Sequence, residues 1–238
     1  CTPPDDAPEG ELPVDDTANF WCTLYGVKRF ADLFTPRQLV ALTTFSDLVA
    51  EARECIRHDS VAAGLRDDGK PLRDGGVGAP AYADGIAAYL GCAVSRMVNY
   101  SATLCVWSSH PKDELAKQVF LRQALPMTWD FAETNPFSSA GGTLDVNIEY
   151  LRKAIERLPG AGEGTALQID ATMVEVRSRV VSTDPPYFDN IGYADLSDFF
   201  YVWMRRSLKP VFPDIFATLT VPKTQELVAT PHRHGSKE

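Results

Sequence analysis

Hydrophobic side chains recur at helical spacing in five stretches of the chain. The first has the clearest start, because Thr35 offers a capping hydroxyl and Pro36 suits the first helical position. An apolar stripe then continues to about His58, through Leu39, Leu42, Phe45, Val49, Ala52 and Ile56. Similar patterns predict helices at about 82–99, 111–133 with a bend at Pro126, 144–158, and a last helix that Asp195 or Ser197 caps and that ends at Leu208. We expect the helices between residues 35 and 133 to form a hairpin or a small bundle.

Strand patterns are shorter. Residues 20–30 are rich in aromatic side chains and predict a short strand or hairpin arm. Residues 165–170 (TALQID) predict a strand that ends in an acid. Residues 180–183, with Arg179 before them, predict a buried strand that stops abruptly, because each of the next two prolines fixes φ and removes a ladder donor.

Two segments show neither the helical spacing nor the strand pattern of hydrophobic residues. Residues 1–19 are rich in Pro, Asp and Glu with few large apolar side chains, and are predicted to be disordered or peripheral. Residues 64–80 contain five Gly and two Pro. They predict a mobile loop rather than a phosphate-binding loop, because their glycines do not mark a strand–helix junction.

The composition is that of an ordinary globular protein, and no run of about 18 apolar residues indicates a membrane span. Five cysteines, at positions 1, 22, 55, 92 and 105, include no Cys-x-x-Cys pair. They predict neither a zinc site nor a disulfide framework, and they favour a reducing cytoplasm. The chain begins with Cys and shows no secretion signal, so we expect a piece of a longer cytoplasmic protein.

The net charge of 23 − 32 = −9 is unfavourable for a protein that binds nucleic acid. Residues 1–34 hold much of this acidity, with two Lys or Arg against seven Asp or Glu. Residues 177–238 are close to neutral, with eight Lys or Arg against seven Asp or Glu.

The sequence Asp184-Pro185-Pro186-Tyr187 carries the chemistry, because it follows a predicted strand at the end where open α/β sheets bind ligands. The Asp184 carboxylate and the Pro185 carbonyl can accept both N–H groups of an exocyclic amine on a nucleobase, which localises the lone pair on the nitrogen. Tyr187, with Phe188 beside it, offers a face for a flipped base. Such stacking contributes roughly 1–3 kcal/mol per base, against a flipping cost of a few kcal/mol.

Asp-Pro-Pro-Tyr resembles the catalytic motif of the amino-methyltransferases that make N6-methyladenine or N4-methylcytosine. The longer run STDPPYFDNIGYADLSDFFYVWMRRSL, with FTPRQLVALTTF and QALPMTWDFAETNPFS upstream, resembles the bacterial adenine-specific DNA methylases that carry a zinc ribbon. The resemblance extends from about Phe34 to the end of the chain. It implies an α/β fold, part of a Rossmann-like methyltransferase sheet with a helical insertion. Residues 1–34 would form an acidic, partly disordered N-terminal segment, 35–143 the helical insertion, and 144–238 part of the catalytic domain.

The resemblance further implies a DNA adenine N6-methyltransferase, present here as a fragment, that uses S-adenosylmethionine and needs no metal. Its catalytic residues would be Asp184, Pro185, Pro186 and Tyr187, and its base-binding residues Phe188, Asn190 and Tyr193. In this class an acid at a strand end accepts from the adenine amino group of the cofactor and the next N–H meets the ring, which nominates Asp170 and Ala171. A solvent-facing strand end is the alternative for those two residues. The implied partners are DNA and, in a restriction or phage-defence system, other proteins.

The chain also departs from the family, because it lacks the zinc-ribbon cysteines and a convincing cofactor loop. Residues 135–143 (NPFSSAGGT) superficially resemble an Asp-Pro-Phe-x-Gly-x-Gly cofactor loop, but they follow a predicted helix and lie only 184 − 135 = 49 residues before Asp184. We expect a helix-ending loop there, with a substrate-facing or cofactor-lid role as the alternative, and weak binding of S-adenosylmethionine by the isolated chain. Methylation of cytosine N4 or of RNA, and a non-catalytic nucleic-acid-binding subunit, are the alternative functions.

Overall fold

The structure, a computed structural model, describes residues 2–112, 114–158, 160, 169–178, 180–184, 188, 191–229 and 233. Within these residues the main helices are α1 (Pro36–Ala62), α2 (Ala79–Val98), α3 (Leu144–Ile155) and α4 (Tyr193–Leu208). Short 3-10 helices are η1 (Trp21–Tyr25), η2 (Phe30–Leu33), η3 (Leu72–Asp74) and η4 (Ala171–Met173). Strands β1 (Trp107–Ser108) and β2 (Leu115–Ala116) form a two-stranded antiparallel sheet.

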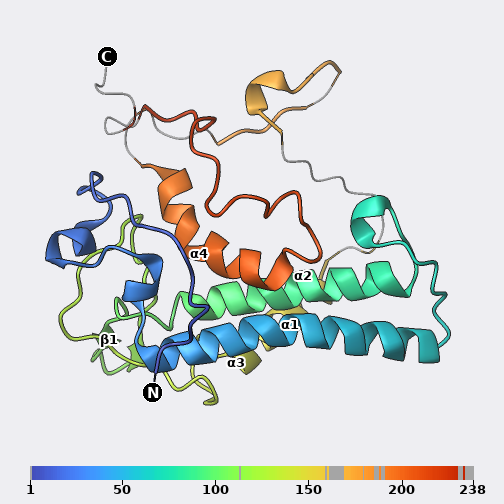
Figure 1. Ribbon diagram of the computed structural model, residues 1–238, viewed down its shortest axis with the longest axis horizontal. Coiled ribbons are helices and arrows are strands. Elements are labelled where there is room, and N and C mark those ends of the chain that lie inside the picture. Colours follow the sequence, from blue (N-terminus) through green and yellow to red (C-terminus); the bar gives the residue numbers. More distant parts are fainter. Residues whose placement is uncertain are drawn as a thin grey trace.

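Helix α2 lies at the centre of the helical core. It runs antiparallel to α1, and it also contacts α3 and α4. Figure 1 shows α4 crossing above α2, while α3 passes behind the α1–α2 pair. The predicted helical hairpin is therefore confirmed, and the helices that precede and follow the motif pack onto it.

The start of α1 is fixed by a capping box. The Thr35 hydroxyl accepts a hydrogen bond from the Gln38 backbone N–H at 3.2 Å, and the Gln38 side chain accepts one from the Thr35 N–H at 2.8 Å. The two bonds satisfy donors that have no partner within the helix. Pro36 needs no such partner because it has no N–H. The predicted helix start is confirmed.

The last helix is also confirmed, but its predicted cap is wrong. Gly192 occupies the capping position of α4 without a side-chain cap. Asp195 lies inside the first turn, and Asp195 and Ser197 are both helical residues. Asp195 is 2% exposed, because it is directed into a buried charge cluster rather than to the helix end.

The main hydrophobic core lies where α4 packs on the start of α1 and the end of α2. Trp203 and Phe199 of α4 are buried there, and the ring centroids of Phe34 and Trp203 are 5.2 Å apart in an edge-to-face arrangement. Burial of each such side chain contributes about 1.5–3 kcal/mol. These contacts make α4 the element that joins the motif region to the helical pair.

The N-terminal segment contributes to this core more than its polar composition predicts. Leu12 is 3% exposed, and its N–H donates to the Lys28 carbonyl at 2.7 Å. The strand or hairpin arm predicted at residues 20–30 is replaced by η1 and the start of η2. The tight 3-10 turn directs Phe20 and Cys22 into the core, and both are fully buried.

Residues 64–80, predicted as a mobile loop, are tied to both helices that they connect. Asp84 of α2 is fully buried and accepts hydrogen bonds from Arg53 Nε at 2.5 Å and from the Leu72 N–H at 2.9 Å. Gly78 allows close packing here, because a Cβ at this position would lie 2.4 Å from the Arg66 carbonyl oxygen.

The helix predicted at 111–133 does not form in the described part of that stretch. Its N–H groups bond to carbonyls far away in the sequence, those of Val119, Leu125 and Ala132 to the carbonyls of Asn99, Asn19 and Cys105. Val119 and Leu125 are buried as separate anchors. Tertiary hydrogen bonds and burial therefore outweigh the helical spacing, and Pro126 could not donate within a helix.

The sheet β1–β2 is the only one that the described residues form. Residues 165–168 of the first predicted strand, and Arg179, which precedes the second, lie outside those residues. The Rossmann-like methyltransferase sheet therefore stays a prediction. Among the helices described, none combines the length and the apolar character needed to cross a membrane.

Candidate functional site

The structure describes the first residue of the motif, Asp184, and the residue that follows the motif, Phe188. Asp184 lies in an irregular segment with its side chain exposed, whereas Pro185, Pro186, Tyr187 and Asn190 lie outside the described residues. Immediately before Asp184, Val180 is fully exposed and Val181 is 55% exposed. The described part of the predicted buried strand is thus neither paired nor buried, because a strand needs a neighbouring strand and the described residues provide none at this place.

Two aromatic side chains predicted to contact the base are accessible. Phe188 is 70% exposed, and its carbonyl accepts a hydrogen bond from the Ala229 N–H at 2.8 Å. Tyr193 is the first residue of α4 and is 44% exposed. Ile191, between them, packs against the main core. The motif loop is therefore anchored on its exit side while its rings stay open to a ligand.

Asp170, predicted to contact the cofactor, has a local structural role. It caps η4, and its Oδ1 accepts hydrogen bonds from the Thr172 hydroxyl at 2.8 Å and the Thr172 N–H at 2.9 Å. These two bonds, the hydroxyl first, lower the pKa of the Asp170 carboxyl. Oδ2 has no partner among the described residues and remains an available acceptor. Ala171 begins η4, directly after Asp170.

A buried charge cluster lies behind the motif, at the start of α4. Asp195 and Asp198 occupy the buried face of the helix, at 2% and 3% exposure. Arg233 forms ion pairs with Asp195 and with Glu226, the latter at 2.9 Å. Lys223 Nζ lies 2.6 Å from the Asp198 carboxylate. Each buried carboxylate therefore has a cationic partner, as burial of charge requires.

Backbone contacts complete this cluster. The Glu226 carboxylate accepts from the Ala194 N–H at 2.7 Å, which satisfies a free donor at the start of α4. Asp198 accepts from the Val221 N–H at 2.8 Å. Burial raises the pKa of the Asp198 carboxyl, and its hydrogen bond with Lys223 opposes that rise. We refer to residues 221–229 with Arg233 as the C-terminal clamp.

The sequence contains a signal for this cluster. Asp195 and Asp198 are three positions apart and fall on the apolar face of a helix, with Phe199 and Val202. Carboxylates at such positions need buried cationic partners. The cations come from residues 25 and 38 positions further along the chain, and the sequence alone does not identify them.

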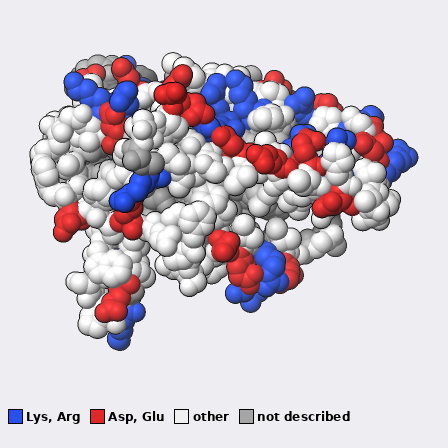
Figure 2. Space-filling model, turned by 60° about the horizontal axis from the view of Figure 1, so that its bottom comes forward, with Lys and Arg blue, Asp and Glu red and all other residues white. Residues whose placement is uncertain are grey.

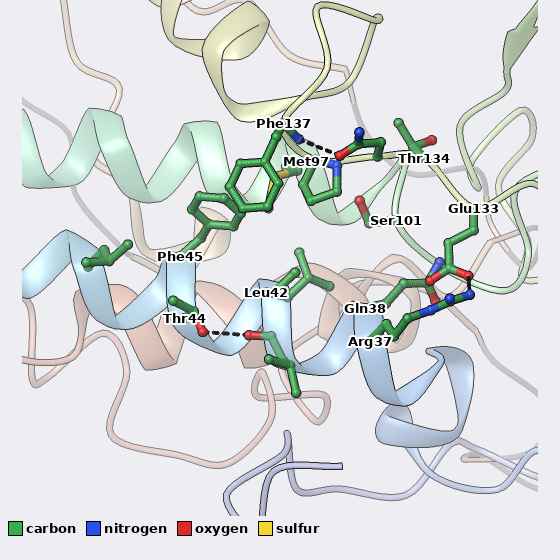
Figure 3. A pocket seen from close by; sticks show the side chains of 15 residues that line it. Arg37, Gln38, Leu42, Thr44, Phe45, Met97, Ser101, Glu133, Thr134 and Phe137 are labelled. Atoms are coloured by element: carbon green, nitrogen blue, oxygen red, sulfur yellow. Dashed lines mark hydrogen bonds and ion pairs between the residues drawn. The ribbon is translucent and has the colours of Figure 1, made fainter. Parts of the chain in front are cut away.

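A separate apolar pocket of about 700 Å³ lies between α1 and the loop at residues 133–137 (Figure 3). Asn135, Pro136 and Phe137 line it, so the stretch weighed as a cofactor loop faces a cavity. The turn is local, because Asn135 Oδ1 accepts from the Phe137 N–H at 3.0 Å. It leads into α3 and does not follow a strand in the described residues.

The surface charge is mixed. The face drawn in Figure 2 has Lys and Arg interspersed with Asp and Glu, next to a broad uncharged area, and no continuous basic band. Elsewhere in the fold, Arg206 of α4 is paired with Asp6 at 2.6 Å and with Asp47 at 2.7 Å. Such ion pairs leave little net positive charge to attract a phosphate backbone.

Comparison of the chain with protein-family models, with curated proteins and with solved structures finds no match. The motif and the described geometry around it are therefore the indications of function.

Proposed function

We propose that this chain is the base-binding part of an S-adenosylmethionine-dependent DNA methyltransferase that acts on the N6 amine of adenine. The observation that carries the proposal is the sequence Asp184-Pro185-Pro186-Tyr187 followed by Phe188 and by helix α4. Both described ends of this loop support it. The Asp184 side chain is exposed and available to a substrate, and the exit of the loop is fixed to a buried cluster.

The role of the motif follows from the chemistry of an aromatic amine. The lone pair of N6 is delocalised into the purine ring, so the amine is a weak nucleophile. The Asp184 carboxylate and the Pro185 carbonyl accept its two N–H groups and localise that lone pair. Tyr187 holds the flipped base, and Phe188, Asn190 and Tyr193 line its pocket. The amine gains a methyl group and releases one proton.

The cofactor supplies the methyl group as an electrophile on its sulfonium. Among the described residues, Asp170 offers the free oxygen Oδ2, which can accept from the adenine amino group of the cofactor, and Ala171 follows with its N–H. No glycine loop of the described chain adjoins them. We therefore expect these 238 residues alone to bind the cofactor weakly, with the remaining contacts supplied by a longer parent chain.

The C-terminal clamp gives the proposed site a rigid base. It bonds to Phe188 just after the motif and to Ala194 at the start of α4. Catalytic groups need support of this kind, because small displacements of reacting atoms cost large factors in rate. The clamp residues act through the loop and are positioning residues rather than catalytic ones.

The test is transfer of labelled methyl from S-adenosylmethionine into unmethylated DNA by the longest chain that contains these residues. Asp184→Ala should abolish transfer and leave the circular dichroism spectrum and the melting temperature unchanged, because the side chain is exposed. Asp214→Ala removes another exposed carboxylate and should retain activity. Near-normal transfer by Asp184→Ala would refute the assigned role.

Analysis of the labelled nucleoside separates the alternatives. N6-methyladenine in DNA is the expected product, whereas N4-methylcytosine or label in RNA would move the proposal to a related substrate. Cofactor binding without transfer to any DNA or RNA would favour a non-catalytic nucleic-acid-binding subunit.

A further inference from the structure

The apolar pocket beside α1 has the size and lining of a small-molecule site. Its volume of about 700 Å³ lies within the usual range for ligand pockets, which is roughly 300–1,000 Å³. Figure 3 shows that α1, the end of α2 and the loop at 133–137 enclose it. Of the residues from Asp184 to Tyr193, none that the structure describes contributes to its lining.

One end of the pocket is aromatic. The ring centroids of Phe45 and Phe137 are 5.9 Å apart with an interplanar angle of 52°, and Met97 and Leu42 lie beside them. Phe137 is 81% exposed on its turn, so most of its ring stays accessible beside Phe45. A flat ligand would cover the exposed face of Phe137.

The other end of the pocket holds two polar side chains with unused hydrogen-bonding groups. Gln38 is 5% exposed, and its Oε1 is taken by the Thr35 N–H, while its Nε2 has no hydrogen-bond partner. Ser101 is 9% exposed, and its hydroxyl has no bond to any described residue. The Ser101 hydroxyl can donate to a ligand acceptor in the pocket, whereas Gln38 Nε2 has almost no accessible surface and lies out of reach of a ligand there.

The charged residues of the lining cancel each other. Arg37 and Glu133 are its cation and its anion, and they form an ion pair of 2.7 Å at the rim. Glu133 also accepts from the Thr35 hydroxyl at 3.1 Å. A phosphate would meet no free cation here, so the lining favours an uncharged ligand.

We propose that this pocket binds a neutral, planar heteroaromatic ligand of nucleoside size. The ring lies on the exposed face of Phe137 and contacts Phe45, and one of its ring nitrogens accepts from the Ser101 hydroxyl. The aromatic face provides stacking, and the Ser101 donor distinguishes a heteroaromatic ring from a hydrocarbon ring. The proposal goes beyond methyl transfer, because none of the motif residues that the structure describes lines the site.

The test measures binding of adenosine, guanosine and cytidine to the whole chain by calorimetry and by ligand-observed nuclear magnetic resonance. Ser101→Ala and Phe45→Leu should each weaken nucleoside binding by about tenfold, the factor that corresponds to one lost hydrogen bond or ring contact. Ser46→Ala is the matched control. It removes a hydroxyl of α1, next to Phe45, that is buried without a hydrogen-bond partner and does not line the pocket.

Adenosine 5′-monophosphate should bind at least tenfold more weakly than adenosine, because its charge finds no partner. Competition by S-adenosylmethionine identifies the source of the ring: displacement of adenosine points to the cofactor, and its absence to a free nucleoside. The proposal is overturned if no nucleoside binds at millimolar concentration, or if Ser101→Ala binds as the parent does. Either result leaves the Asp184→Ala transfer experiment unaffected, so the two proposals fail separately.

Discussion

Gly91 of α2 tests directly whether α2 and α4 pack as described. A Cβ at this position would lie 2.8 Å from Cγ and Cδ1 of Leu208 and 2.9 Å from its Cδ2. Leu208 is 2% exposed and is enclosed by its neighbours. Overpacking of this kind costs about 1–3 kcal/mol, whereas replacing glycine by alanine within a helix gains about 1 kcal/mol. Gly91→Ala should therefore lower the free energy of unfolding by about 0–2 kcal/mol.

Gly85, in the same helix, is the matched control. A Cβ there would meet nothing within 4 Å, so Gly85→Ala should raise the free energy of unfolding by about 1 kcal/mol. Urea denaturation followed by far-ultraviolet circular dichroism measures both changes. The two values are comparable when the free energy of unfolding falls with urea concentration at the same slope in each variant. The same substitution in one helix is thus expected to have opposite effects at two sites.

A double-mutant cycle identifies Leu208 as the cause. Leu208→Ala alone should cost about 2–5 kcal/mol, because it leaves a cavity between the helices. In that background the methyl group of Gly91→Ala has space, so the second substitution should stabilise by about 1 kcal/mol. If Gly91→Ala stabilises the parent chain as much as Gly85→Ala does, the close approach of α2 and α4 is wrong.

Two further predictions concern buried groups. Burial raises the pKa of the Cys22 and Cys105 thiols to about 11. Little thiolate forms at these two residues below that pH, so iodoacetamide at pH ~8 should label the exposed Cys55 first. Peptide mass mapping measures the labelling. Equal labelling of Cys22, Cys55 and Cys105 would contradict the burial of Cys22 and Cys105. Arg233→Met removes the cationic partner of the half-buried Glu226 carboxylate and one partner of the buried Asp195 carboxylate, and loss of such an ion pair costs about 3–5 kcal/mol. Hydrogen exchange at Ala194 should then accelerate while α1 and α2 keep their protection, and unchanged exchange would show that the clamp does not need Arg233.

The helices of this chain could be predicted from the sequence because their signals are local. Thr35-Pro36 specifies the start of α1, and apolar spacing locates α2, α3 and α4 closely. The error at 111–133 has a physical cause. Apolar residues there have helical spacing, but backbone bonds such as Leu125 N–H to the Asn19 carbonyl join segments that no periodicity relates.

The candidate site likewise combines residues that a local signal indicates with partners that only the fold reveals. A short motif predicts Asp184 and Tyr187 as residues of an amine-binding loop, because their residue types and order carry the information. The described partners of Phe188 and of the start of α4 come from the C-terminal clamp, and pairing of Asp195 with Arg233 depends on the folded chain. The pocket at Phe45 and Phe137 likewise joins residues from α1 and from a distant turn, so only the fold reveals it.

The C-terminal clamp contacts the region around α4 at several points at once, as a multivalent ligand contacts its receptor. Its contacts to Phe188 and Ala194 are single hydrogen bonds, and its contact to Asp198 is one backbone hydrogen bond and one ion pair. Once one is formed, the short chain between them holds the others at a high effective concentration. Release of the segment thus requires several contacts to open together, while any single one can break and reform. Phe188 and the start of α4 are consequently held by avidity, and loss of one contact should loosen them far less than loss of two.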